Sequence, residues 1–276
     1  MRTYQLPLDL VRERPPERPV ALVRPRSVSV AARWFQDNLK ADVFYAVKAN
    51  PSRWVVETLV EAGVRGFDVA SLAEIELVRS VSADARLAFM HPVKSRSAIT
   101  RAYFDHGVRT FSLDCVEELN KILDATGGAD DLNPIVRMAV SADGAAYTLS
   151  GKFGVSADQA PALLMATRQA VKEGLMGVSF HVGSQCMRPS AFQAAMAQVG
   201  RSISRAGVIV DIVDVGGGFP SVYPGMVPPD LQEYADAIHR GFAEMPVTHT
   251  TELWCEPGRA LVAEASSLLV KVELKK

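Results

Sequence analysis

The feature that most constrains the fold is a regular alternation of strand-like and helix-like segments. Apolar, β-forming runs recur at 43–48, 64–69, 86–90, 108–113, 134–140, 177–182, 209–215 and 249–255. Between them, apolar residues follow helical spacing at 52–62, 71–80, 95–106, 114–125, 156–173, 189–206 and 229–243. Alternation of this kind produces βαβ units around a parallel sheet.

Eight strands are the number that closes a (β/α)8 TIM-like barrel, which typically takes about 250 residues. This α/β fold suits the 276-residue chain, and the near-regular repeats favour it over a doubly wound open sheet.

Two helix starts also carry capping boxes, Ser71 to Glu74 and Asp114 to Glu117. In such a box, side chains satisfy the first free backbone N–H groups of the helix.

Both ends of the chain depart from the alternation. Residues 1–18, rich in Arg, Glu and Pro, predict an extended arm or loop, followed by a strand at 19–23 and a helix at 28–39. Near the other end, four apolar residues alternate with polar ones and predict a half-buried strand next to 19–23: Leu268, Val270, Val272 and Leu274. We therefore predict an N-terminal arm and strand (1–25), a barrel (26–260) and the first strand of an incomplete β-domain (261–276).

Composition argues against several classes of protein. The net charge of −1 gives no basis for binding nucleic acid or an anionic membrane. Three widely spaced cysteines, Cys115, Cys186 and Cys255, argue against a disulfide framework and for a reducing compartment. The five histidines form no metal-ligand cluster, so no metal site is expected. No signal peptide and no apolar run of about 18 residues is present, so we expect a cytoplasmic protein.

The first strand-like run ends at a lysine, in Phe44-Tyr45-Ala46-Val47-Lys48-Ala49-Asn50-Pro51. The Asn-Pro pair is a turn signal, so Lys48 is expected where a core strand opens into a loop. Burial there would push the pKa of the lysine down, and a neutral amine can form a Schiff base with a carbonyl. Because most lysines simply reach solvent, the rest of the chain has to decide between the two interpretations.

In a closed barrel, active-site residues come from the carboxyl ends of the strands. Here these ends are rich in polar residues and glycine: Lys48, Asp68, Arg137, His181, Ser184, Gly216, Gly217, Gly218, Glu256, Gly258 and Arg259. The spacing alone places all of them at one mouth of the barrel.

The run Gly216-Gly217-Gly218 follows the seventh strand, close to where barrels often bind phosphate. Successive glycines let backbone N–H groups converge on an anion, although three glycines alone are equally compatible with a flexible turn. The G-x-G-x-x-G spacing of dinucleotide sites is absent. Arg259 and Ser184 could bind the same phosphate; otherwise they are a surface arginine and a turn cap.

Glu256 ends the eighth strand beside apolar residues, where a carboxylate could pair with a pyridinium nitrogen. His181 lies between Phe180 and Val182, so its ring could lie flat against another ring, although a satisfied core histidine is more common. An amine, a phosphate cradle, an acid and a stacking imidazole match the four groups of pyridoxal 5'-phosphate. The mouth therefore predicts this cofactor.

With these motifs, the chain resembles the pyridoxal-phosphate-dependent decarboxylases of fold type III, the group with an alanine-racemase-like barrel. Within that group it is most similar to the ornithine decarboxylases, including bacterial lysine/ornithine forms. The matching pieces run in order over roughly residues 40–260: Phe44-Tyr45-Ala46-Val47-Lys48-Ala49-Asn50, Phe67-Asp68-Val69-Ala70-Ser71, Gly151-Lys152-Phe153-Gly154, Ser179-Phe180-His181-Val182-Gly183-Ser184, Asp214-Val215-Gly216-Gly217-Gly218-Phe219-Pro220 and Glu256-Pro257-Gly258-Arg259.

The resemblance implies roles for the matching positions. Lys48 would hold the cofactor as a Schiff base, and His181 would stack on its ring, which makes these two the catalytic residues. Glu256 would bind the ring nitrogen, and Asp68 and Arg137 would support the residues in contact with the cofactor. The remaining positions would form or shape the phosphate end: Ser184, Gly216, Gly217, Gly218, Gly258 and Arg259.

The resemblance also implies a function, the decarboxylation of a basic amino acid by a homodimer, most similar to the conversion of L-ornithine to putrescine in polyamine biosynthesis. Relatives continue into a C-terminal β-domain that supplies substrate-binding and proton-donating residues, whereas this chain stops at Lys276. Two alternatives stay open: a non-catalytic or regulatory homologue that keeps the barrel, and another reaction on the same fold, such as diaminopimelate decarboxylation or racemisation.

Overall fold

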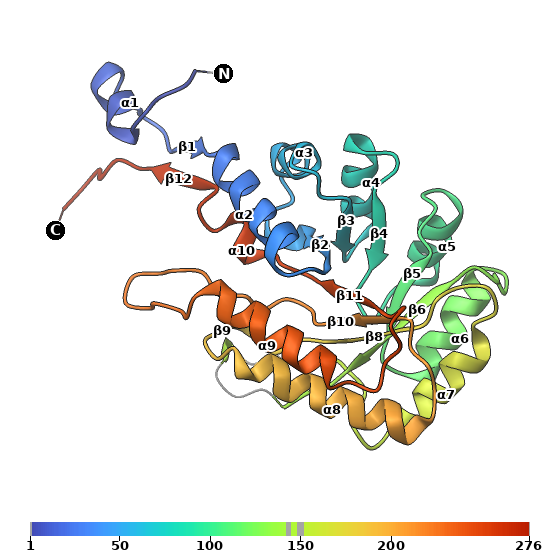
Figure 1. Ribbon diagram of the computed structural model, residues 1–276. Helices are drawn as coiled ribbons and strands as arrows, with labels where there is room; N and C mark the ends of the chain where they lie inside the picture. The colour runs from blue at the N-terminus through green and yellow to red at the C-terminus, as the bar shows by residue number, and fades with distance from the viewer. Residues whose placement is uncertain (1, 142–144, 148–151, 276) are drawn as a thin grey trace.

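The computed structural model describes residues 2–141, 145–147 and 152–275 and contains a closed barrel of parallel strands (Figure 1). The barrel strands are β2 (Asp42–Ala46), β3 (Gly66–Val69), β4 (Arg86–Phe89), β5 (Thr110–Leu113), β6 (Asn133–Met138), β8 (Gly177–Phe180), β10 (Ile212–Asp214) and β11 (Glu252–Cys255). Their order is β10-β11-β2-β3-β4-β5-β6-β8, and β8 pairs with β10 to close the barrel. The predicted (β/α)8 barrel is confirmed.

Helices follow the strands and cover the outside of the barrel (Figure 1). They are α2 (Pro25–Asn38), α3 (Arg53–Glu61), α4 (Leu72–Val81), α5 (Arg96–Phe104), α6 (Val116–Ala125), α7 (Ala160–Ala170), α8 (Ser190–Ala206) and α9 (Leu231–Ala243). Local chemistry sets some of their ends: α8 stops at Gly207, whose φ of 64° is left-handed, and Asp230 and Glu233 form a capping box at the start of α9.

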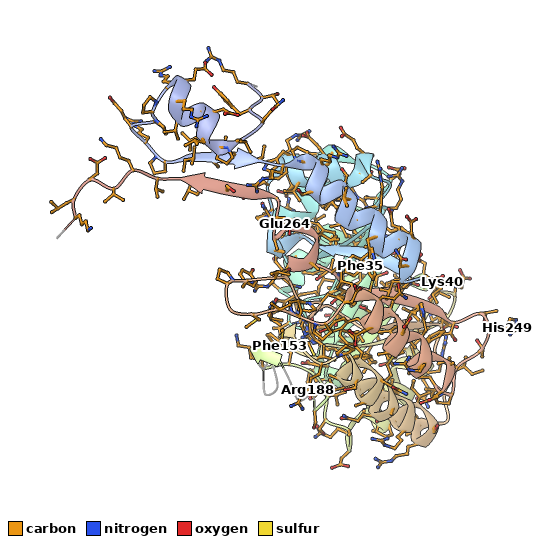
Figure 2. The ribbon with its side chains drawn as sticks, turned by 60° about the vertical axis from the view of Figure 1, so that its left-hand side comes forward. Phe35, Lys40, Phe153, Arg188, His249 and Glu264 are labelled. Carbon is orange, nitrogen blue, oxygen red and sulfur yellow. The ribbon has the colours of Figure 1, made fainter. Side chains whose placement is uncertain are left out.

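Aromatic side chains join the helices to the barrel. Phe35 points inward from α2 (Figure 2), and its ring centroid lies 5.0 Å from that of Phe219, which follows β10. Phe192 of α8 stacks on the same ring at 5.1 Å. The backbone of the glycine run before Phe219 is therefore anchored by a fully packed aromatic cluster.

Of the two predicted capping boxes, the one at Ser71 forms in part and the one at Asp114 does not form. Ser71 Oγ accepts a hydrogen bond from Glu74 N at 3.3 Å, but the Glu74 carboxylate accepts from Ala70 N at 2.7 Å instead of completing the box. At α6 the prediction is wrong, because the N-cap residue is Cys115 and its side chain makes no cap hydrogen bond. The Asp114 carboxylate instead accepts from Gly154 N at 2.9 Å, so a tertiary contact replaces the local one.

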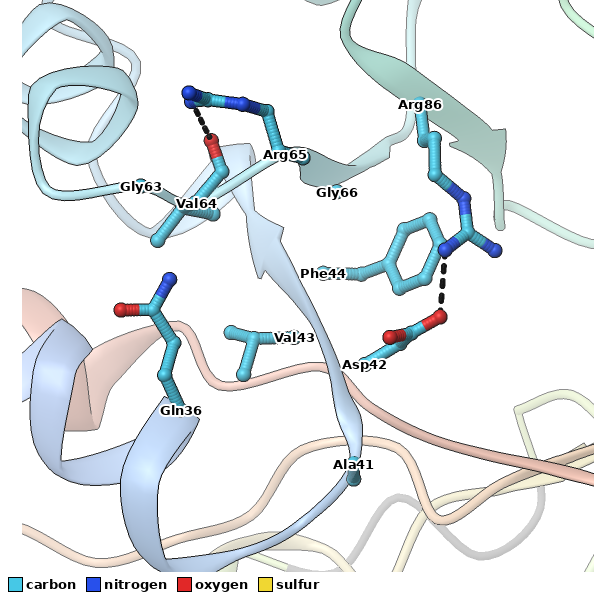
Figure 3. Close-up of a pocket in the computed structure, with 10 residues that line it drawn as sticks. All are labelled: Gln36, Ala41, Asp42, Val43, Phe44, Gly63, Val64, Arg65, Gly66 and Arg86. Atoms are coloured by element: carbon cyan, nitrogen blue, oxygen red, sulfur yellow. Dashed lines mark hydrogen bonds and ion pairs between the residues drawn. The ribbon is translucent and has the colours of Figure 1, made fainter.

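An arginine closes the amino-terminal end of the barrel. Phe44 and Trp254 stack with 4.2 Å between ring centroids, and the Arg86 guanidinium lies 5.3 and 5.2 Å from the two rings. Asp42 and Glu252 bind the same guanidinium at 2.5 and 3.3 Å. Figure 3 shows Arg86 beside the Phe44 ring and bonded to Asp42, at the wall of a cavity of ≈ 210 Å³. This layer fills the end of the barrel opposite to the strand-end residues predicted above.

Two short strands from opposite ends of the chain pair outside the barrel. β1 (Val20–Val23) and β12 (Ser266–Leu269) are antiparallel, as predicted, and both views show this pair projecting from the barrel (Figures 1 and 2). The predicted burial is wrong, however. The four alternating apolar residues between 268 and 274 are 63–77 % exposed, because no described segment packs against them, and the strand ends at Leu269.

The N-terminal segment also differs from the prediction. Residues Pro7–Glu13 form the helix α1 instead of an extended arm. Pro7 has its φ preset for the first helical turn, and the Asp9 carboxylate accepts a hydrogen bond from Leu6 N at 2.9 Å. The division of the chain into 1–25, 26–260 and 261–276 stays a prediction.

Candidate active site

The carboxyl ends of the barrel strands surround a cavity of ≈ 210 Å³. It is lined by Ala46, Lys48, Ala49, His181, Ser184, Gly217, Gly218, Phe219, Glu256, Gly258 and Arg259. Eight of the eleven residues predicted from the sequence therefore line one cavity. The other three, Asp68, Arg137 and Gly216, lie behind the lining and act on residues within it.

Lys48 lies in a short 3-10 turn, η1 (Val47–Ala49), rather than on the strand itself, because β2 ends at Ala46. Its Nζ is 2.6 Å from Asp68 Oδ2, and Asp68 comes from the neighbouring strand β3, opposite Ala46. The Asp68 side chain is fully buried, and its second oxygen, Oδ1, has no hydrogen-bond partner among the described residues. The turn thus directs the amine across the mouth to a buried carboxylate.

The predicted lowering of the Lys48 pKa is wrong. Burial does lower the pKa, but the charges of Asp68 and Glu256 outweigh burial and raise the pKa above its ordinary value. The Lys48 side chain is 57 % exposed, so solvent screens part of these charge effects, and the direction rests on the 2.6 Å contact with Asp68. Without a ligand, Lys48 is an ammonium held in place by Asp68.

The glycine run after β10 has no room for side chains. A Cβ on Gly216 would lie 2.2 Å from the Phe180 carbonyl oxygen, and Gly216 has a left-handed φ of 67°. A Cβ on Gly217 would lie 2.7 Å from the Glu256 carbonyl oxygen, and one on Gly218 (φ 104°) would lie 2.5 Å from that of Gly183. The backbone of the glycine run therefore passes directly against the segments at the ends of β8 and β11, which fixes the shape of this wall of the cavity.

Polar groups meet at the same end of the cavity. Arg259 is the first residue of α10 (Arg259–Val262), and its guanidinium lies 3.5 Å from Ser184 Oγ. Ser184 begins β9 (Ser184–Cys186), which pairs with β7 (Ala145–Tyr147). A cation, a hydroxyl and the backbone of Gly217 and Gly218 together suit an anion such as phosphate.

Two buried carboxyl groups interact at this mouth of the barrel, Glu256 in the cavity lining and Asp214 at the end of β10. Burial raises the pKa of Glu256 well above its ordinary value, and the negative charges of Asp214 and Asp68 raise it further. Burial also raises the pKa of Asp214, to about 7, while a hydrogen bond from Gly216 N (2.8 Å) opposes this shift. Glu256 therefore binds its proton more tightly than an exposed glutamate, and its Oε1 has no partner among the described residues.

His181 is neutral in this site. Burial lowers its pKa to about 3, and the positive charges of Arg137 and Lys48 act in the same direction. Its Nδ1 accepts a hydrogen bond from Gly183 N at 2.9 Å, which assigns the ring proton to Nε2. The Arg137 guanidinium lies 5.8 Å from the Phe153 ring, and its positive charge contributes to the lowered pKa of His181.

The sequence singled out neither Asp214 nor Tyr223 as site residues. Asp214 lies two residues before Gly216, and its position at a buried strand end was the available signal. Tyr223, whose hydroxyl lies 2.8 Å from an Arg259 nitrogen, sits in an irregular loop with no pattern that marks it.

Gly151, part of one matching motif, lies outside the described residues. In the described ranges, no group of three His, Cys, Asp or Glu residues could hold a metal ion.

The match with a protein family decides what this site belongs to. A model of the "pyridoxal-dependent decarboxylase, pyridoxal binding domain" family matches residues 26–263. The chain belongs to the pyridoxal-dependent decarboxylases. Among the helices that the structure describes, none is long and apolar enough to cross a membrane.

Sequence similarity to individual proteins agrees with the family match. The chain is 34 % identical to a lysine/ornithine decarboxylase of Selenomonas ruminantium over 237 residues, which cover 84 % of this chain and 58 % of that protein. It is 36 % identical to antizyme inhibitor 2 of Xenopus laevis over 239 residues, which cover 84 % and 50 %. The chain thus spans about half the length of these relatives.

Solved structures of decarboxylases share the fold. Lysine decarboxylase from Selenomonas ruminantium superposes with a TM-score of 0.83 at 28 % identity, covering 100 % of this chain and 73 % of that one. Arginine decarboxylase of Paramecium bursaria Chlorella virus, bound to agmatine, gives 0.81 at 27 % identity, covering 95 % and 69 %.

The residues of this chain fit the family's cofactor, pyridoxal 5'-phosphate. The unpartnered Glu256 Oε1 suits a pyridine nitrogen, and the glycine run leaves a backbone cradle that any Cβ would fill. Lys48 Nζ offers an amine to the aldehyde. The donor set therefore matches the nitrogen, the phosphate and the aldehyde of this group.

Proposed function

We propose that the chain is the cofactor-binding barrel of a basic amino-acid decarboxylase, with L-ornithine as substrate and putrescine as product. The observation that carries the proposal is the position of Lys48, Glu256 and the glycine run around one cavity. An amine, a buried carboxyl group and an anion cradle at separate walls suit pyridoxal phosphate and few other ligands. The Selenomonas relative is a lysine/ornithine decarboxylase, and this similarity supports the class of substrate.

Each side chain has a definite task in this proposal. Lys48 would hold the cofactor through its aldehyde, and Asp68, 2.6 Å away, holds the amine in position and balances its charge. Glu256, whose pKa is raised by burial, would bind the ring nitrogen of the cofactor. His181, neutral and fixed by Gly183 N, supplies a flat uncharged face for the ring.

The reaction breaks the bond between the α-carbon and the carboxylate, releases carbon dioxide and places a proton on the α-carbon. Pyridoxal phosphate, when bound, supplies the electron sink for the electron pair left behind. Arg259, Ser184 and the glycine backbone would hold the phosphate, and His181 would contact the ring. We further propose that the protein is a homodimer, which light scattering would test. We also propose that it is cytoplasmic, which cell fractionation would test.

The test combines trapping of the cofactor with an assay. The chain is incubated with pyridoxal phosphate, reduced with borohydride and analysed by mass spectrometry; we expect the label on Lys48. Release of carbon dioxide is then measured with L-ornithine, L-lysine and meso-diaminopimelate. Lys48→Ala should abolish both signals, whereas Lys172→Ala, which removes a surface lysine paired with Asp130, should change neither. Label distributed over surface lysines alone would overturn the proposed site.

A second function is favoured by one observation. A relative named antizyme inhibitor 2 is 36 % identical to this chain, which supports a non-catalytic homologue as the alternative. Both functions keep the barrel, and only one requires turnover. Specific trapping at Lys48 without release of carbon dioxide from any of the three amino acids would support the non-catalytic function, whereas turnover of ornithine would exclude it.

A further inference from the structure

A strained residue lies directly beside Ser184. Gln185 has a φ of 55°, a left-handed conformation that is unfavourable for a residue with a Cβ. Among the described residues, Lys40 is the only other non-glycine residue with positive φ. Gln185 is also buried, with 3 % of its surface exposed. A strained, buried amide must be held by strong contacts with its surroundings.

The side-chain amide of Gln185 makes two hydrogen bonds with the backbone of Ser221, one through its oxygen and one through its nitrogen. Gln185 Oε1 accepts from Ser221 N at 3.0 Å, and Gln185 Nε2 donates to the Ser221 carbonyl. The same nitrogen lies 3.5 Å from Met226 Sδ. One side chain therefore ties the segment after Ser184 to the loop 221–226, which follows the glycine run.

That loop carries an aromatic residue to Arg259. Tyr223 and Met226 exchange two backbone hydrogen bonds, of 2.9 and 3.3 Å, which make the loop a tight turn. The Tyr223 hydroxyl accepts a hydrogen bond of 2.8 Å from Arg259, whose guanidinium lies 5.7 Å from the tyrosine ring. The same guanidinium reaches Ser184 Oγ at 3.5 Å. The hydroxyl hydrogen of Tyr223 has no acceptor in the described part of the chain, so it can donate to an anion.

We propose that Tyr223 is a phosphate-binding residue of this cavity and that Gln185 is the positioning residue that holds its loop in place. The inference rests on the proposed cofactor site. Gln185 acts through the loop 221–226, and Tyr223 fixes the direction of the Arg259 guanidinium while donating its own hydroxyl to the phosphate. The strain at Gln185 is sustained because its amide joins the two backbone segments that border the phosphate.

The experiment compares pyridoxal phosphate with pyridoxal, which has the same aldehyde and no phosphate. Affinities of the apo chain for both are measured by absorbance titration for Tyr223→Phe, Gln185→Ala and the double variant. We expect each single variant to bind pyridoxal phosphate about three- to tenfold more weakly, the range of one or two hydrogen bonds. Pyridoxal affinity should stay unchanged, and the double variant should be no weaker than Gln185→Ala, because both act through one contact.

Matched controls exist elsewhere in the chain. Gln198 makes the same two-sided bond with the backbone of Ser141, at 3.2 and 3.0 Å. Tyr103 also lies beside an arginine, with the Arg109 guanidinium 4.0 Å from its ring, but its hydroxyl donates to Asp131 at 2.7 Å. Gln198→Ala and Tyr103→Phe should leave both affinities unchanged. Gln185→Gly, which relieves the left-handed strain, replaces Gln185→Ala if the latter does not fold.

Three results would overturn the inference. They are equal weakening of both ligands, no change in pyridoxal phosphate affinity, and full additivity in the double variant. If the unmodified chain binds neither ligand at Lys48, the proposed cofactor site itself fails, and the inference fails with it. Failure of the variants alone leaves the proposed function intact.

Discussion

Lys48 Nζ lies 2.6 Å from Asp68 Oδ2, so the amine of the mouth is held as an ammonium by a fully buried carboxylate from the next strand. Asp68 therefore controls when this amine becomes a nucleophile. The lysine can react with an aldehyde only after it loses its proton, and the negative charge beside it opposes that loss.

Removing this charge should make Lys48 more reactive. In Asp68→Asn, the lowering of the Lys48 pKa by burial is no longer outweighed by the Asp68 charge, so the pH midpoint of covalent pyridoxal phosphate capture should fall. At pH 8 we expect capture to be faster on the order of tenfold, which corresponds to one pH unit of midpoint shift. Stopped-flow absorbance measures the rate, and Asp124→Asn, which affects a surface pair with Arg96, is the control. A midpoint that rises would contradict the assignment.

The carboxyl pair Asp214 and Glu256 should make stability depend on pH. An unfolded aspartate loses its proton near pH 3.9, about its ordinary pKa, whereas folded Asp214 keeps its proton up to about pH 7. Within this window the folded chain binds the extra proton, so stability falls as pH rises and levels off above about pH 7.

Asp214→Asn should flatten that dependence by on the order of 1 kcal/mol per pH unit between pH 4 and 7. Urea unfolding at several pH values measures the slope for the variant and the parent chain. Asp236→Asn removes a surface carboxylate that bonds Gln232 on α9 and should leave the slope unchanged. The same slope in all three chains would show that Asp214 titrates normally.

A fully buried ion pair lies outside the cavity lining. Lys94 Nζ is 3.0 Å from Glu118 Oε1, with the two side chains 0 % and 4 % exposed, and the same ammonium donates to the carbonyls of His91 and Ser112. Burial lowers the pKa of Lys94 to about 8, while Glu118 opposes the shift. Lys94 is not among the residues that line the cavity, and we assign it a structural role.

Glu118→Ala should destabilise the chain by about 3–5 kcal/mol, because it leaves a buried ammonium without its partner. The loss should be smaller above pH 8, where Lys94 becomes neutral. The double variant Lys94→Met, Glu118→Leu should recover most of the stability, since it removes both charges. Denaturant titration measures all three chains, and equal losses in the single and double variants would contradict the pair's importance.

Arg86 is expected to contribute stability without any effect on the cofactor site. Its guanidinium lies over Phe44 and Trp254 and binds Asp42, at the closed end of the barrel (Figure 3). Arg86→Met should cost about 1–2 kcal/mol, the sum of partly exposed cation–π and ion-pair contacts. Arg101→Met, which breaks a surface pair with Glu76, should cost less than about 0.5 kcal/mol. Weaker pyridoxal phosphate binding by Arg86→Met would show that the two ends of the barrel are coupled.

The sequence by itself determined the barrel and which residues meet at its mouth. Strand and helix periodicity are local properties, and in a parallel barrel every strand ends on the same side, so Lys48, His181 and Glu256 had to converge. The same reasoning could not find Tyr223, because the loop that carries it has no periodic pattern. It also placed a capping box at Asp114, whose carboxylate binds Gly154 instead.

Only the tertiary structure decided the charge states and the supports of the site. The pKa of Lys48 rises rather than falls, because a residue 20 positions away lies within 2.6 Å of its amine. Gln185 bonds to Ser221, 36 positions away, and the apolar residues after β12 are exposed because no described segment covers them. Electrostatic energies and packing depend on distances between segments remote in the chain, and these distances exist only once the barrel has closed.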